Sequence, residues 1–312
     1  MIHVLAIHVS ANDLRRDDVI DFDGKQVRLT QVSTDFDYNL AKDLIVKYDG
    51  LVDAISLSGI PPAMKSGQKI FSHPDRERLL LAAEETPVLD GLVLKEIYMP
   101  WLLRKFFVNN PEWIKNKKVG FYSGLLMQQT LEVIEDFTEE LVLADLYFLA
   151  KVPWLLNSTK EMRSVLEKSW PLMKMRSVRK KSLGSFDGQI LGRYQMRDFL
   201  SAQVVVSNMA TLELIDLSHL RGKKLILDVC NQKILDLLKM NGVEEVLILL
   251  PQMIDGIFVN FSILEGLLQA SQNLHKSLTV DFVLSHMKSL KISPIVVSLK
   301  ETKTFETQFL YL

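Results

Sequence analysis

The chain alternates short apolar runs with segments in which apolar residues recur at helical spacing. In its first third this pattern predicts strands at residues 2–9, 26–32 and 52–57, and helices at 38–49 and 74–85. Strands that alternate with helices are typical of right-handed, mostly parallel sheets. We therefore expect an α/β fold of mostly parallel, doubly wound sheets, arranged as two Rossmann-like lobes with a cleft between them.

A second strand–turn–helix unit begins at Lys117, which places the predicted lobe boundary near residue 115. The sequence thus predicts an N-terminal α/β lobe at 1–115 and a Rossmann-like lobe at 116–312. Within the second lobe, residues 141–148 are predicted to form a strand. A basic helical insertion is expected at about 153–195, where glycines suggest a linker or loop.

Composition and charge narrow the class of protein. The 312 residues carry 37 Lys and Arg against 38 Asp and Glu, a formal net charge of -1, so nucleic acid is not expected as a partner. A single cysteine excludes an intramolecular disulfide framework and a cysteine-based zinc cluster, and no histidine spacing indicates a metal site. No signal peptide or bilayer-spanning stretch is evident, and we expect a cytoplasmic protein.

One segment departs from this balanced charge. Residues 160–181 carry a net charge of +6 from eight basic and two acidic side chains: Lys160, Arg163, Lys168, Lys174, Arg176, Arg179, Lys180 and Lys181 against Glu161 and Glu167. A solvated helix face is the simpler interpretation. The alternative is a surface that meets an acidic partner or a membrane.

Polar residues follow several predicted strands, at the edge where open parallel sheets bind ligands. The segment most similar to a dinucleotide-binding turn is the one that contains Gly120, Ser123 and Gly124. Its glycine spacing differs from the usual fingerprint. His8 lies near the carboxyl end of the first strand, which makes it more interesting than His3, although a structural or surface role is the favoured interpretation for each histidine. In any single loop, the small and polar residues are also explained as ordinary turn residues.

Cys230 follows a predicted strand, and no histidine lies near it in the sequence. A buried, inert thiol is the favoured interpretation, because free cysteine commonly packs as a small hydrophobic side chain. A nucleophilic thiol acting on an acyl thioester is the weaker alternative.

Six short stretches, in order and with similar spacing, resemble a group of bacterial Rossmann-type proteins labelled quinate 5-dehydrogenase-like. They are residues 33–37, 50–60, 86–91, 220–224, 241–243 and 251–256. The resemblance identifies the chain as a diverged member, because the turn at 120–128 has fewer glycines and an expected arginine is absent at 256–259. It implies a nicotinamide-dependent dehydrogenase.

Two hypotheses of function follow. The first is an oxidoreductase that uses NAD or NADP and acts on a small carboxylate or acyl substrate. Asp90 and Lys95 would then supply the polar catalytic groups, because a lysine beside a carboxylate can donate a proton to a carbonyl. The remaining candidates are Gly120, Ser123, Gly124, Asn208 and Asn231 for the cofactor, and Asp35, Gly59, Gly256 and Asn260 for the substrate.

The second hypothesis is a non-catalytic binding or scaffold protein that uses residues 160–181 to meet its partner. In either case we expect a small-molecule ligand, and we leave self-association into a homo-oligomer open.

Overall fold

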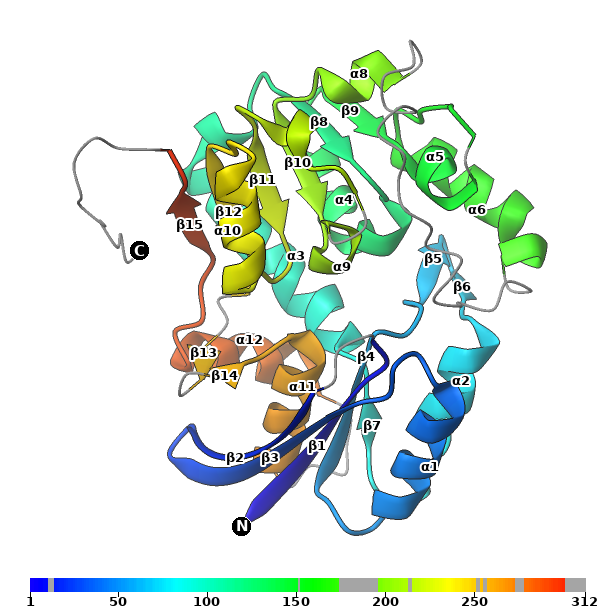
Figure 1. The fold of residues 1–312 in the computed structure, drawn as a ribbon, viewed down its shortest axis with the longest axis vertical. Coiled ribbons are helices and arrows are strands. Elements are labelled where there is room, and N and C mark those ends of the chain that lie inside the picture. Colours follow the sequence, from blue (N-terminus) through cyan, green and yellow to red (C-terminus); the bar gives the residue numbers. More distant parts are fainter. Residues whose placement is uncertain are drawn as a thin grey trace. The chain divides into compact units, whose positions relative to one another are not determined.

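The computed structural model describes residues 1–10, 14–150, 152–173, 196–212, 215–250, 253–254, 257–272 and 278–300, without the side chains of 148–150, 172–173 and 253. The chain divides into two compact α/β units, each with its own mostly parallel sheet (Figure 1). The α/β class expected from the sequence is confirmed. None of the helices in these ranges has the length and hydropathy needed to cross a bilayer.

The first unit contains Met1–Met99 and, from much later in the chain, Gln252–Lys291. Its strands are β1 (Ile2–His8), β2 (Arg15–Phe22), β3 (Lys25–Ser33), β4 (Ala54–Ser58), β5 (Met64–Ser66), β6 (Lys69–Phe71), β7 (Val88–Leu89), β13 (Met253–Ile254) and β14 (Ile257–Phe258). Its helices are α1 (Tyr38–Tyr48), α2 (Pro74–Leu80), α11 (Phe261–Ser271), α12 (Val280–Ser289) and the first part of α3 (Leu92–Asn109). This division differs from the boundary predicted near residue 115, because α11 and α12 return to the first unit.

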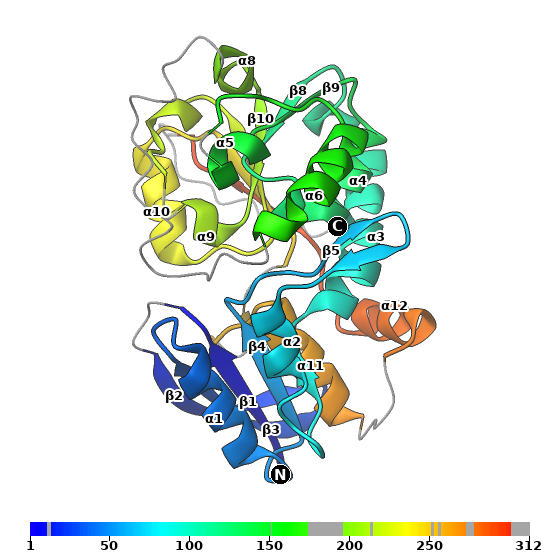
Figure 2. The same cartoon turned by 90° about the vertical axis from the view of Figure 1, so that its right-hand side faces the viewer.

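The main sheet of the first unit has the order β2-β3-β1-β4-β7. Only β2 runs antiparallel, joined to β3 by a tight turn in which Asp23 and Gly24 both have positive φ. Side chains alternate between the two faces. Leu5, Ile7 and Leu57 pack with α1 and α2 on one face, and α11 contacts β1 and β4. Figures 1 and 2 show α11 on the face opposite α1 and α2.

The second unit holds the middle of the chain and the last strand. Its strands are β8 (Lys118–Phe121), β9 (Glu140–Leu143), β10 (Val204–Ser207), β11 (Lys224–Leu227), β12 (Glu245–Ile248) and β15 (Ile295–Ser298). Its helices are α4 (Gln128–Glu135), α5 (Asp145–Ala150), α8 (Arg197–Leu200), α9 (Met209–Leu212), α10 (Gln232–Met240) and short 3-10 turns at Pro111–Trp113, Leu125–Met127 and Ser218–Leu220. The helix α6 (Thr159–Met173) crosses from this unit into the first.

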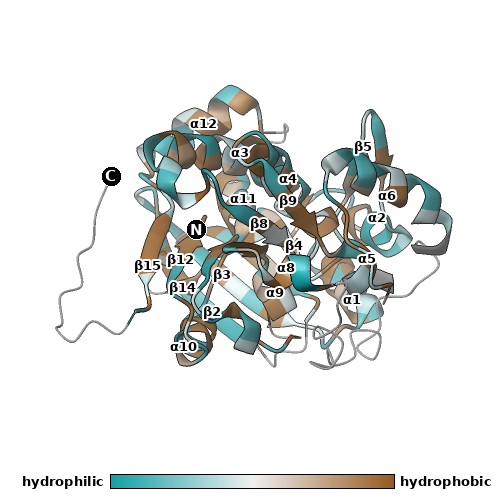
Figure 3. Ribbon diagram, turned by 90° about the horizontal axis from the view of Figure 1, so that it is seen from above, coloured by the Kyte–Doolittle hydropathy of each residue, from teal (hydrophilic) through white to brown (hydrophobic). Residues whose placement is uncertain are grey.

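The sheet of the second unit has the order β15-β12-β11-β10-β8-β9, and only β15 is antiparallel. Its edge strand β15 is apolar (brown in Figure 3). The strand predicted at 141–148 is too long: β9 ends at Leu143, and α5 begins at Asp145. The strand β9 ends early because of a tertiary contact, in which the Asp145 carboxylate accepts hydrogen bonds from the turn after β8.

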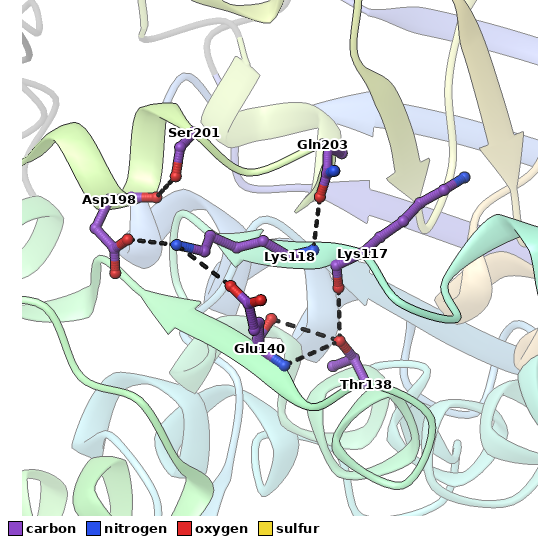
Figure 4. Close-up of polar contacts among 7 residues, drawn as sticks. All are labelled: Lys117, Lys118, Thr138, Glu140, Asp198, Ser201 and Gln203. Carbon is purple, nitrogen blue, oxygen red and sulfur yellow. Dashed lines mark hydrogen bonds and ion pairs between the residues drawn. The ribbon is translucent and has the colours of Figure 1, made fainter.

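Polar contacts join the amino ends of three strands of this sheet (Figure 4). The ammonium group of Lys118, at the start of β8, pairs with Asp198 and lies 3.4 Å from the carboxylate of Glu140 on β9. The backbone N–H of Lys118 donates to the side-chain oxygen of Gln203, just before β10, at 2.7 Å. This exposed network holds the strands in register at the edge opposite the one where parallel sheets bind ligands.

Candidate functional site at the carboxyl edge of the first sheet

The carboxyl ends of β1, β3 and β4 bring three polar residues side by side. His8 is in register with Ser33 on β3 and with Ser58 on β4. His8 and Ser58 are half-buried, and the neighbouring Gly59 is exposed. This edge of an open parallel sheet is where ligands bind, so His8 and Ser58 stand where a small molecule can reach them.

Both ring nitrogens of His8 are hydrogen-bonded. Its Nδ1 lies 2.8 Å from the Ser58 hydroxyl, and its Nε2 lies 3.2 Å from Oε1 of Gln31 on β3. An amide oxygen can only accept, so the ring proton lies on Nε2 and Nδ1 is left to accept from the Ser58 O–H. Burial lowers the pKa of His8, partly opposed by its bond with Gln31, which favours the neutral ring.

The same face of the sheet continues beneath α11 with small and polar side chains. Ser56 on β4 is fully buried, and its hydroxyl has no hydrogen-bond partner among the described residues. Gly266 lies directly above it, where a Cβ would stand 2.2 Å from Ser56 Oγ. Every residue of α11 is buried, so the absence of a side chain at Gly266 lets this helix approach the sheet closely.

Asp90, a predicted catalytic residue, is held by structural contacts. One carboxylate oxygen accepts from the N–H of Leu92 at the start of α3, at 3.2 Å. The other accepts from Arg76 of α2 at 2.8 Å, in an ion pair whose side chains are each 11% exposed. Asp90 therefore caps α3 and neutralises a nearly buried arginine.

Glu265 of α11 places a second carboxylate at the start of α3, and it was not among the site residues predicted from the sequence. It lies in the middle of α11, almost fully buried, and accepts from the N–H of Leu94 at 3.3 Å. Burial raises the pKa of Glu265 to about 7, and the charge of Asp90 adds to this, while hydrogen bonds from the α3 backbone and the charge of Lys95 oppose it. The sequence signal that could have identified Glu265 is a lone acidic residue in an otherwise apolar helix pattern.

Lys95 and Asn260 lie near these carboxylates. The Lys95 ammonium stands 6.0 Å from the ring centre of Phe261 and makes no ion pair within the described residues. Asn260 caps α11, accepting from the N–H of Ile263 at 2.9 Å and from the hydroxyl of Ser262 at 2.8 Å. The structure thus brings three predicted residues, Asp90, Lys95 and Asn260, to one end of the first sheet.

The backbone at Gly91 makes this convergence possible. Gly91 has a φ of +82°, and a Cβ there would lie 2.7 Å from the backbone nitrogen of Ser262. The loop after β7 therefore touches the beginning of α11, although the two are about 170 residues apart.

The other predicted substrate residues lie apart from these contacts or outside the described ranges. Gly59 has a φ of +76° and crosses close to the carbonyl oxygen of Val9, which a Cβ would approach to 2.2 Å. Asp35 is exposed in the loop between β3 and α1, with a φ of 45°. Gly256 falls outside the described residues. So do Lys174, Arg176, Arg179, Lys180 and Lys181 of the basic segment.

The turn after β8, where the sequence suggested a dinucleotide, is already filled by a side chain of the protein. The buried carboxylate of Asp145 accepts from the Ser123 hydroxyl at 2.8 Å and from the N–H groups of Gly124 and Leu125, both at 2.9 Å. These are the donors that a pyrophosphate would need at a helix start. Burial raises the pKa of Asp145, and the three donors oppose that shift.

The remaining cofactor candidates also have internal roles. A Cβ at Gly120 would press against Phe199 at 3.0 Å, so this glycine serves packing. The side-chain oxygens of Asn208 and Asn231 accept from backbone N–H groups in the first turns of α9 and α10. These residues do not fit a bound NAD or NADP.

The thiol of Cys230 is fully buried, and burial raises its pKa to about 12. A thiol with this pKa supplies almost no thiolate near neutral pH. Within the described ranges, no three His, Cys, Asp or Glu side chains are grouped to hold a metal ion.

Three solved structures are remotely similar to the chain. GanP, a glucose-galactose binding protein from Geobacillus stearothermophilus, is 8% identical, with a TM-score of 0.38 over 97% of this chain and 99% of its own. A putative malic enzyme (malate oxidoreductase) is 9% identical, with a TM-score of 0.33 over 78% and 65%. FolD, a bifunctional methylenetetrahydrofolate dehydrogenase/cyclohydrolase from Campylobacter jejuni, is 10% identical, with a TM-score of 0.26 over 85% and 77%.

No curated protein matches the chain. Two family matches divide it at the end of β7, between Asp90 and Val93. The family described as Domain of unknown function (DUF8753) matches residues 3–90. The match to the other covers about two thirds of the chain, and the protein belongs to that family, Domain of unknown function (DUF8754), over residues 93–299.

Proposed function

We propose that the protein binds a small carboxylate or acyl compound at the carboxyl edge of the first sheet, near His8, Ser58 and Lys95. The observation that carries the proposal is Lys95, a half-buried residue whose ammonium makes no ion pair in the described part of the chain, whereas Arg76 is neutralised by Asp90. A cation without an ion-pair partner at a ligand-binding edge favours an anionic group.

Hydride transfer is not part of this proposal. The substrate class agrees with the one expected from the sequence, but the residues expected to hold NAD or NADP are used internally, above all by Asp145. The alternative of a scaffold that uses residues 160–181 receives little support from the described part of α6. There Arg163 pairs with Glu132 at 2.6 Å, as expected of a solvated helix face.

Thermal unfolding with a panel of ligands tests the proposal. The panel contains acetate, lactate, malate and benzoate, together with NAD, NADP and their reduced forms. At 100 times its dissociation constant, a bound ligand adds about 2.7 kcal/mol to the free energy of unfolding. We expect at least one carboxylate to raise the melting temperature and the dinucleotides to leave it unchanged.

Two lysine variants locate the binding. Lys95→Met keeps the apolar stem and removes the charge, so it should abolish the stabilisation by the carboxylate. Lys47→Met is the matched control, because Lys47 also lies over an aromatic ring, that of Tyr48 at 5.6 Å, but in the last turn of α1. Equal stabilisation of both variants, or no response to any carboxylate, would contradict the proposal.

A further inference from the structure

Three side chains from three adjacent strands form a hydrogen-bonded chain with a defined direction. Gln31 accepts from Nε2 of His8, and Nδ1 of His8 accepts from the hydroxyl of Ser58. A hydroxyl, a neutral imidazole that can take its proton, and a third group that fixes the imidazole tautomer form the recurring arrangement of nucleophilic catalysis. The His8–Ser58 distance of 2.8 Å lies within the range that this arrangement needs.

The hydrogen-bonded series of Gln31, His8 and Ser58 differs from ordinary buried hydrogen bonds because Ser58 is accessible. Ser56, two residues earlier on the same face of β4, is fully buried beneath α11, whereas Ser58 is half-buried at the end of the strand. Ser58 is therefore the serine of this face that an external molecule can approach.

Backbone donors for a developing negative charge lie beside Ser58. The N–H groups of Gly59 and Ile60, the two residues after it, have no hydrogen-bond partner among the described residues. The N–H of the residue that follows a nucleophile commonly forms half of an oxyanion hole. The positive φ of Gly59 turns the chain away from the strand here, which leaves its N–H out of the sheet ladder.

We propose that Ser58 is an acyl-accepting nucleophile, with His8 as its general base and Gln31 as a positioning residue, acting on an ester or thioester of the ligand; this rests on the binding proposed above. The Ser58 Oγ forms a bond to the carbonyl carbon while its proton passes to His8 Nδ1. The bond from that carbon to the leaving oxygen or sulfur breaks, and the leaving group takes the proton from His8. Water then repeats the sequence on the acyl-serine and releases the carboxylate.

A fluorophosphonate probe tests the nucleophile without knowledge of the natural substrate. It forms a bond from Oγ to phosphorus with loss of fluoride, and mass spectrometry of the digested protein locates the modified residue. We expect stoichiometric labelling at Ser58, complete loss of that label in Ser58→Ala, and undiminished labelling in Ser56→Ala as the matched control. Label on other serines only, with Ser58 unmodified, would overturn the assignment.

The roles of His8 and Gln31 are tested by the pH profile of the labelling rate. In the unmodified protein the rate should rise as His8 loses its proton, with a midpoint below pH 6.5, since burial lowers the pKa of His8 from its ordinary value of 6.5. His8→Asn should slow labelling by at least about a hundredfold, in keeping with the usual contribution of a general base. Gln31→Leu should slow it, and Gln31→Glu should restore it with the midpoint moved to higher pH, because a carboxylate stabilises the imidazolium.

The outcomes separate this inference from the binding proposal. If a carboxylate stabilises the protein through Lys95 and Ser58 remains unlabelled, the nucleophile is refuted and binding stands. If Ser58 is labelled with the expected pH profile and no carboxylate binds, the nucleophile stands and the ligand class is refuted. Far-UV circular dichroism of each variant confirms that loss of labelling is not loss of folding.

Discussion

Gly266 on α11 and Ser56 on β4 meet so closely that a Cβ at position 266 would lie 2.2 Å from the serine hydroxyl. The same Cβ would lie at an ordinary 3.6 Å from Ser56 Cβ. The serine oxygen is therefore the main obstacle to a side chain at position 266, and Cγ1 of Val4, at 3.3 Å from the same Cβ, is the next. This contact sets how close α11, with Glu265 and the Asn260 cap, lies to the strands that carry His8 and Ser58.

Gly266→Ala should destabilise the protein by about 1–3 kcal/mol, the usual cost of overpacking a core. Ser56→Ala should be neutral or stabilising, because the buried hydroxyl has no partner among the described residues. The double variant should recover most of the loss, since the clash with the serine oxygen is gone, only the 3.3 Å contact with Val4 Cγ1 remains, and alanine favours a helix over glycine by about 1 kcal/mol. Urea unfolding of the four proteins measures the cycle, and additive effects of the two changes would contradict it.

Asp145→Ala should lower the free energy of unfolding by about 3 kcal/mol or more. It removes the acceptor of three hydrogen bonds in the turn after β8 and leaves the Ser123, Gly124 and Leu125 donors buried without a partner. The control is Asp198→Ala, which removes the carboxylate that pairs with Lys118. The Asp198 side chain is 55% exposed, so this substitution should lower the free energy of unfolding by less than about 1 kcal/mol. Similar losses in the two variants would show that the Asp145 carboxylate does not hold the turn.

Glu265 should make stability fall as pH rises. Its pKa is about 7 in the folded protein against 4.5 for an ordinary glutamate. Between these values the folded state binds more protons than the unfolded chain, so the free energy of unfolding declines across this window and is level above it. Over the full window the loss is on the order of 3 kcal/mol.

Glu265→Gln cannot ionise and should remove this slope, so that the variant is more stable than the unmodified protein at pH 8 but not at pH 4.5. Urea unfolding at several pH values measures the difference. Parallel pH profiles for the two proteins would show that Glu265 titrates in its normal range.

Cys230 should react slowly with thiol reagents in the native protein. Burial raises its pKa to about 12, which leaves about one thiolate in 10⁵ at pH 7. Labelling by iodoacetamide should be complete only after denaturation, and Cys230→Ser should leave carboxylate binding unchanged. Rapid stoichiometric alkylation of the folded chain would instead support the acyl-thioester alternative that the sequence allowed.

Local patterns predicted most elements of the fold, and non-local contacts account for the differences. The hairpin at Asp23-Gly24 follows from turn chemistry alone. The strand predicted through 141–148 was wrong beyond Leu143 because the Asp145 carboxylate is held by a turn more than 20 residues away. Periodicity does not report such a contact.

The candidate site was predicted in part for the same reason. Asp90, Lys95 and Asn260 were chosen separately, and the structure brings them together through the contact of Gly91 with α11. His8 attracted attention by its position at a strand end. Gln31 did not, because its role depends on the register between β1 and β3, which no local pattern specifies.

Histidine nuclear magnetic resonance during titration with a carboxylate that stabilises the protein is the most direct test of binding at the first sheet. The chain has six histidines, and comparison with His8→Asn assigns the His8 imidazole signal. We predict that the His8 signal shifts and saturates at the dissociation constant measured by calorimetry, while that of His219 in the second unit stays in place. A saturating shift at His219 with His8 unchanged would contradict a ligand site at the carboxyl edge of the first sheet.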